Sequence, residues 1–208
     1  ETYREAIALA ESIPATPREI AILWGNLADQ WMARNDLDAA FRAGCETLES
    51  LLLDEGSTPE ERAGAIRRIA RIQRRRGNAA EAVSRMKEAL EVAQVPESHP
   101  MVASIHNEMG QVYANLGDTE AARGAFDRAW ALASKHRSAG SKDWNITLIM
   151  RLNFLVAEDD RAAVLAMLRD GLRALEETLG EDDYRTREAR GLLAEYSRRW
   201  GESPGGSD

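Results

Sequence analysis

The sequence is poor in several residue types, and each shortage excludes a class of structure. Its 208 residues include one cysteine, three histidines and 6% aromatic residues. The single Cys45 excludes an internal disulfide, and we expect its side chain to pack in a core rather than react. Strand-forming residues are few, whereas Ala, Leu, Glu and Arg dominate, and this mixture favours helix almost throughout. We therefore predict an all-α protein.

Long apolar runs are also missing, and the charge is unbalanced. No run approaches the roughly 20 apolar residues that cross a bilayer, and no charged and then apolar leader opens the sequence. We therefore expect a soluble, cytoplasmic protein without a membrane partner. The formal net charge of -8 argues against broad nucleic-acid binding, which needs a basic field over a whole face.

The residue patterns of catalytic and metal sites are not found either. The three histidines, His99, His106 and His136, lack the spacing of metal ligands, and no cysteine pair accompanies them. The tail contains GESPG around Ser203, but a nucleophile elbow needs a preceding strand and a following helix, which this segment does not have. We predict no metal, no cofactor and no enzymatic activity.

A pattern of small and large apolar residues repeats along the chain. It is most complete from Ala103 to His136, where its members are Met109, Gly110, Tyr113, Gly117, Ala122, Phe126 and Ala129. The small residues allow two antiparallel helices to approach closely, and the large ones fill the remaining gaps. The same spacing begins again at residues 21, 63, 145 and 187, so the steps are 42, 40, 42 and 42 residues.

This pattern resembles the tetratricopeptide repeat, and the long step is similar to the repeats of kinesin light chains and of bacterial proteins with such arrays. The resemblance implies a right-handed α-solenoid of antiparallel helix pairs that binds other proteins. We predict a single array over residues 1–201, followed by a disordered tail over 202–208. Its predicted parts are a half-repeat at 1–13, repeats at about 21–54, 63–96, 103–136 and 145–178, and a capping helix at 183–200.

Helix-start signals support this phasing independently. In ATPRE, Thr16 is placed to cap a helix, with Pro17 in the first turn and Glu19 completing a capping box. The segment STPEE repeats the signal, and ESHPM places Ser98 or His99 before a proline in the same way. The doublets Asp159/Asp160 and Asp182/Asp183 also precede predicted helices, where carboxylates satisfy free N–H groups.

The segment Ile66–Gly77 reads IRRIARIQRRRG and contains six arginines. In tetratricopeptide arrays the first helix of each repeat lines the concave groove, and the resemblance directs Arg67, Arg71, Arg74 and Arg75 into it. Helical spacing supports a shared face, because three of these residues are successive i, i+4 neighbours. Like charges in this arrangement repel one another, so we expect an anionic group opposite them.

Two interpretations of this face are open. In the first, the groove binds an acidic or phosphorylated segment of a partner protein. The predicted peptide-binding residues are then Asp29, Arg67, Arg71, Arg74, Arg75, Asn107, Gln111 and Asn115. In the second, the face is paired internally, with Asp29 near enough to bind Arg71. Arg68 and Arg76 lie off this face and are expected only to aid solubility.

The fourth repeat and the chain ends allow further interpretations. The groove positions of that repeat, Ile146, Ile149, Asn153 and Val156, either hold an apolar anchor of the partner or belong to the core, which we favour. The first residues match the second helix of a repeat, so we expect an excerpt of a longer array. This expectation leaves two alternative functions, a sensory domain of a larger bacterial regulator or kinase that responds to a peptide or small ligand, and a spacer that stacks head to tail.

Overall fold

A computed structural model describes residues 5, 8, 12, 16–136 and 138–201. Of the predicted half-repeat at 1–13, most residues lie outside this set, as does the predicted tail at 202–208. The described residues form helices and no strand, so the all-α prediction is confirmed. The chain divides into two compact units, residues 1–96 and residues 97–208, and each is described by itself.

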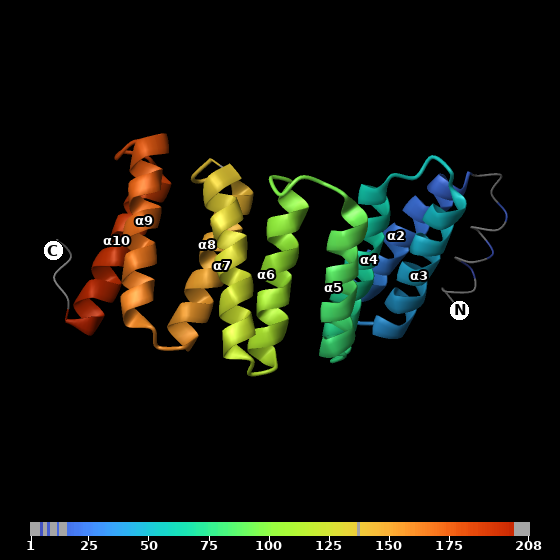
Figure 1. Cartoon of the computed structure of the whole chain (residues 1–208), viewed down its shortest axis with the longest axis horizontal. Coiled ribbons are helices and arrows are strands. Elements are labelled where there is room, and N and C mark those ends of the chain that lie inside the picture. The colour runs from blue at the N-terminus through green and yellow to red at the C-terminus, as the bar shows by residue number, and fades with distance from the viewer. Residues whose placement is uncertain (1–4, 6–7, 9–11, 13–15, 137, 202–208) are drawn as a thin grey trace. The chain divides into compact units, whose positions relative to one another are not determined.

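The first unit contains two antiparallel helix pairs (Figure 1). Its helices are α2 (Pro17–Ala33), α3 (Leu37–Leu53), α4 (Pro59–Arg75) and α5 (Ala79–Ala93). Helix α2 packs on α3 and α4 packs on α5, while α3 also contacts α4 and so joins the two pairs. This packing buries Trp24, Trp31 and Ile72 together in one cluster.

The second unit contains two further pairs and a final helix (Figure 1). Its helices are α6 (Pro100–Asn115), α7 (Thr119–His136), α8 (Lys142–Ala157), α9 (Arg161–Leu179) and α10 (Tyr184–Trp200). The core lies mainly between α7, α8 and α9, where the rings of Phe126 and Phe154 have centroids 5.1 Å apart. Helix α10 closes this core by packing on α9.

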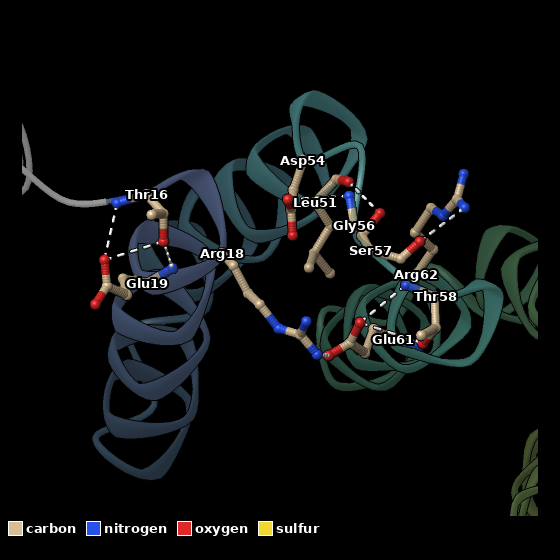
Figure 2. Close-up of polar contacts among 10 residues, drawn as sticks. All are labelled: Thr16, Arg18, Glu19, Leu51, Asp54, Gly56, Ser57, Thr58, Glu61 and Arg62. Atoms are coloured by element: carbon tan, nitrogen blue, oxygen red, sulfur yellow. Dashed lines mark hydrogen bonds and ion pairs between the residues drawn. The ribbon is translucent and has the colours of Figure 1, made fainter.

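The predicted helix starts are confirmed in atomic detail. Figure 2 shows both capping boxes, in which the hydroxyl of Thr16 accepts from the backbone N–H of Glu19 and that of Thr58 accepts from the N–H of Glu61. The glutamates in turn accept from the threonine N–H groups at 2.8 and 2.9 Å. In α6 the cap is His99, whose Nδ1 accepts from a backbone N–H at 3.3 Å.

One tight turn recurs at the same position of every frame. Its central residue has a left-handed backbone, and the five examples are Asn35 (φ 62°), Gly77 (φ 85°), Gly117 (φ 75°), Asp159 (φ 53°) and Gly201 (φ 73°). Glycine, asparagine and aspartate are the residues that adopt this conformation most readily. In the first four turns the next N–H donates to the carbonyl of the fifth residue before it, at 2.9 to 3.0 Å. The turns therefore follow the frames read from the sequence.

Small residues within a pair set how closely its helices approach. A Cβ added to Gly110 of α6 would lie 2.8 Å from the Phe126 ring of α7, closer than a carbon atom can approach. Ala40, Ala82 and Ala122, at one position of three successive frames, are fully buried. Cys45 does not follow the prediction made for it, because its side chain is exposed on the outer face of α3. The expectation that it packs in a core was wrong.

Candidate functional site

Three arginines of the Ile66–Gly77 segment are bound within the first unit. The guanidinium of Arg68 donates to the carboxylate of Asp29 on α2, with N to O distances of 3.3 and 3.4 Å. The predicted pairing of Asp29 with Arg71 was therefore wrong. Position along α4 explains the difference, because a shift of three residues turns a side chain by about 300° around the helix axis.

Arg75 and Arg76 also hold neighbouring helices. Arg75 Nη1 donates to the backbone carbonyl of Met32 at 2.6 Å, and Nη2 donates to Asn35 Oδ1 at 3.1 Å. This contact adds a second donor to a carbonyl in the last turn of α2, which also accepts from the backbone N–H of Asn35 at 3.1 Å. Arg76 Nη2 donates to Asp38 Oδ1 at 2.8 Å. Arg68 and Arg76 thus join helices, and the expectation that they only aid solubility was wrong.

The other arginines of α4 behave differently. Arg67, Arg71 and Arg74 are half-buried, on the side of α4 that the repeat pattern directs to the groove. Within the described part of the chain, Arg71 makes no hydrogen bond or ion pair. A half-buried guanidinium retains a strong tendency to bind an anion. The segment therefore divides into arginines that join helices and one that is available to a ligand.

The predicted residues of the second unit have different surroundings. Asn107 is only 3% exposed, and its Nδ2 donates to Thr147 Oγ1 at 2.9 Å, while its Oδ1 has no partner. Gln111 is half-buried, and Asn115 is exposed at the end of α6. These residues and the arginines belong to different units, so a single face that includes both sets stays a prediction.

A crevice lies between α2 and α4 in the first unit, and its volume is about 310 Å³. Its lining comprises Arg18, Ala21, Ile22, Gly25, Asn26, Thr47, Leu51, Glu61, Gly64, Ala65 and Arg68. The floor is apolar, because Ala21, Leu51 and Ala65 form one buried cluster. The two glycines leave the walls without side chains, and a Cβ added to Gly64 would meet nothing within 4 Å. This crevice fits an apolar group.

An ion pair closes one end of this crevice. Figure 2 shows Arg18 of α2 reaching across to Glu61 of α4, at the ends where both helices begin. The hydrogen bond from the backbone N–H of Thr58, together with Arg18, holds the pKa of the Glu61 carboxyl below its ordinary value. Glu61 therefore caps its own helix and joins it to α2. Near the other end lies the Arg68 pair with Asp29.

The second unit has a crevice at the equivalent place, but its volume is only about 50 Å³. It is lined by Pro100, Ala103, Ser104, Asn107, Ala133, Asp143, Ile146 and Thr147. Each number is 82 higher than that of a residue lining the first crevice, so the two cavities are repeats of one feature. Asn107 stands where the first unit has Gly25, and its hydrogen bond to Thr147 fills the space.

Helix α8 carries apolar side chains on the surface. Ile146 and Ile149 are 39% and 55% exposed, so these two do not belong to the core, as we had favoured. Asn153 is also exposed, and Val156 is half-buried against the core. The alternative interpretation, an apolar contact for a partner, therefore fits the two isoleucines better.

The described residues offer no arrangement for metal chemistry. No group of three or more His, Cys, Asp or Glu side chains among them is placed to hold a metal ion. Burial lowers the pKa of His106, with Arg128 adding to the effect. Over the same residues, no helix combines the length and apolarity needed to cross a membrane.

Sequence reasoning missed several residues of the crevice. Gly25, Gly64 and Arg18 were not singled out. One signal was present in the sequence, because glycines occur at two groove positions of neighbouring first helices. Glycine inside a helix is unfavourable by about 0.5–1 kcal/mol relative to alanine, so a pair of them on facing helices indicates a close approach or an open space.

Comparison with known proteins agrees with this architecture. BtubC (BKLC) from P. vanneervenii has a similar structure, with a TM-score of 0.73 and 19% identity over 96% of this chain and 80% of that one. The putative kinesin light chain repeats of Podospora anserina give a TM-score of 0.71, with 14% identity and coverage of 91% and 90%. A Rap protein complexed with Competence and Sporulation Factor gives 0.67, with 18% identity and coverage of 94% and 58%.

These likenesses define the class as an all-α array of paired antiparallel helices. Residues 61–135 match the tetratricopeptide repeat family, and they span the second and third predicted repeats. The chain as a whole is similar in structure to repeat proteins of the kinesin light chain type. No curated protein shows significant sequence similarity to the chain.

Proposed function

We propose that this protein is an interaction scaffold that binds an acidic or phosphorylated segment of a partner protein along α4. One observation carries the proposal. Arg71 is half-buried and has no anionic partner among the described residues, whereas Arg68 and Arg75 of the same helix, and Arg76 directly after it, are bound to α2 and α3. A carboxylate or phosphate from a partner would supply the missing charge.

The crevice between α2 and α4 adds a second element of recognition. It offers an apolar volume of about 310 Å³, and its lining includes Arg68 of the same helix as Arg71. A partner segment that carries one apolar side chain next to acidic groups satisfies both features. Arg67 and Arg74 of α4 extend the proposed site as predicted from the repeat pattern.

The experiment is a binding assay with an array of acidic and phosphorylated peptides, each accompanied by an isostere in which Asp and Glu become Asn and Gln. Peptides selected by the parent chain are then measured by fluorescence polarisation. We expect Arg71→Glu to weaken binding at least about tenfold, because one charge-assisted hydrogen bond is worth roughly 1.5–3 kcal/mol.

The matched control is Arg34→Glu, the same charge change at an exposed position after α2 in the same unit. Equal binding of acidic peptides and their amide isosteres would overturn the proposal. So would an equal loss of affinity in the two variants, because that result would reflect only net charge.

A sensory role is a second candidate, and one observation favours it. The Rap protein that has this fold is complexed with Competence and Sporulation Factor, and this chain spans 58% of its length. An array of this kind can therefore form part of a longer protein that binds a small factor. Hydrogen exchange measured with a peptide selected in the binding assay distinguishes the two roles. Slower exchange in α2 and α4 and also in α8 would support the sensory role, whereas protection confined to α2 and α4 would favour the scaffold.

A further inference from the structure

A cavity of the second unit lies outside the proposed peptide face. It has a volume of about 480 Å³ and opens between α7 and α9, the second helices of neighbouring pairs. Its lining comprises Trp130, Ser134, Ser138, Ala139, Trp144, Asp170, Ala174, Glu177 and Thr178. Small residues from α7, α9 and the segment before α8 meet here and leave the indole of Trp130 partly exposed, while that of Trp144 is buried beneath.

The floor of this cavity is aromatic and firmly held. Trp144 is only 2% exposed, and its ring centroid lies 5.4 Å from that of Trp130, with an angle of 52° between the planes. Leu175, Ala133 and Ala139 pack around this pair. Rings fixed in this way present a π-surface to a ligand without a further loss of conformational entropy.

The walls are polar, and they carry charge of one sign. Asp170 and Glu177 are exposed on the same side of α9, two turns or about 10 Å apart. Asp170 has a long ion pair with Arg173, at 3.7 Å, which solvent screens strongly. Glu177 has no ion pair among the described residues, and no described lining residue is a cation.

We propose that this cavity binds an organic cation, a guanidinium or primary ammonium group, against the indole of Trp130 and between Asp170 and Glu177. Cations are attracted to the electron-rich face of tryptophan, and carboxylates beside the ring add a directional charge. The group could belong to a free small molecule or to an arginine or lysine side chain of a partner. This site is independent of the proposed peptide face on α4.

The test is titration of the full chain with N-acetyl-arginine amide and N-acetyl-lysine amide. Binding is monitored through the indole N–H signal of Trp130 in ¹H–¹⁵N NMR spectra. The signal is assigned by its loss in Trp130→Phe. N-acetyl-citrulline amide, which has nearly the shape of the arginine probe without its charge, is the ligand control. We expect saturable shifts with the two cations, a Kd of about 0.1–10 mM as for a single ion pair with a cation–π contact, and none with citrulline.

Two double variants separate the site from general electrostatics. Asp170→Asn with Glu177→Gln is expected to weaken binding at least tenfold. Asp182→Asn with Glu188→Gln removes the same charge from exposed positions outside the cavity and is expected to leave binding unchanged. Equal effects of the two double variants, equal shifts with citrulline, or no shift with either cation would overturn the proposal.

Two further binding measurements identify the source of the cation. A basic peptide that binds at least tenfold more tightly than the free amides indicates a side chain of a partner, whereas equal affinities indicate a small molecule. Arg137 of this chain lies outside the described residues. If the amides bind only after Arg137→Ala, then Arg137 itself competes for the cavity, and the proposal of an external ligand is overturned.

Discussion

The two crevices between neighbouring helix pairs have the same place in the repeat and differ about sixfold in volume, at 310 and 50 Å³. In the first unit the walls carry Gly25, Gly64 and Ala65, and an ion pair closes one end. In the second unit Asn107 and Thr147 fill the equivalent space with a buried hydrogen bond. The same backbone thus provides a cavity or a sealed contact, according to the side chains that line it.

The difference in volume indicates different roles: the filled crevice stabilises its unit, and the open crevice is available for binding. The filled crevice contributes to stability within its unit, because its polar groups are buried and depend on each other. The open crevice leaves apolar surface in contact with water and is stabilised by long side chains across its ends. We therefore expect substitutions in the second crevice to affect folding, and those in the first to affect binding.

The largest effect is expected for Thr147→Val in the second crevice. The valine cannot accept the hydrogen bond from Asn107 Nδ2, and the amide is then left buried and unpaired. The free energy of unfolding should fall by about 1–3 kcal/mol, measured by urea denaturation. Ala65→Val is the matched control, because it introduces the same residue at the equivalent position. A similar loss in both variants would contradict the comparison.

A smaller effect is expected from the carboxyl that closes the first crevice, and it depends on pH. The pKa of Glu61 is lowered in the folded protein by the backbone hydrogen bond from Thr58 and by Arg18. Its stabilising contribution is therefore complete above its unfolded pKa of about 4.3 and is lost as the pH falls through the lower folded value. Glu61→Gln should flatten the decline in stability that the parent shows below about pH 4.3.

Glu19 provides the control for that measurement. Its pKa is also lowered, first by the backbone hydrogen bond from Thr16, but it makes the capping box without the cross-helix ion pair. Glu19→Gln should flatten the decline in stability less than Glu61→Gln does. The difference between the two variants should equal the contribution of the Arg18–Glu61 ion pair, about 0–1 kcal/mol for an exposed pair. Identical pH profiles for the two variants would show that the Arg18 contact contributes nothing.

The third prediction concerns glycine on the crevice wall. A Cβ at position 64 would meet nothing within 4 Å, so Gly64→Ala should raise the free energy of unfolding by about 0.5–1 kcal/mol through helix propensity. Gly110→Ala is the contrasting variant, because its Cβ would collide with Phe126, and it should lower stability. Thermal unfolding of both variants measures the difference, and destabilisation by Gly64→Ala would show that the wall is already packed.

The smallest effect is expected for Asp29→Asn. Its ion pair with Arg68 is long and partly exposed, and such pairs contribute about 0–1 kcal/mol. Urea midpoints at low and high salt should therefore differ little between this variant and the parent. A loss above about 2 kcal/mol would mean that this pair holds the two walls together as strongly as a buried network does.

The sequence predicted the features that depend on local chemistry. Thr16 and Thr58 form their capping boxes, because these structures are decided within a few residues. Contacts between helices were less predictable. Asp29 pairs with Arg68 rather than Arg71 because of how α2 and α4 are rotated and how far apart they lie. The repeat pattern does not specify the rotation or the separation accurately enough to choose between two side chains.

Burial on a face was predictable only where the repeat is regular. Asn107 was placed in an open groove, but it is buried because Thr147 faces it on the next first helix. Ile146 was favoured as core and is exposed, because the degenerate fourth repeat leaves this part of α8 uncovered within its unit. The burial of Asn107 thus depends on a residue of a neighbouring repeat, 40 positions away.

The three arginine contacts between α2 and α4 also have a mechanical consequence. Arg18, Arg68 and Arg75 tie the two helices at the beginning, the middle and the end of their length. A force that pulls α2 from α4 must stretch all three ties together. Salt screens the two ion pairs but has less effect on the bond to the neutral carbonyl of Met32. The first unit should therefore soften under tension as ionic strength rises and then reach a constant residual stiffness.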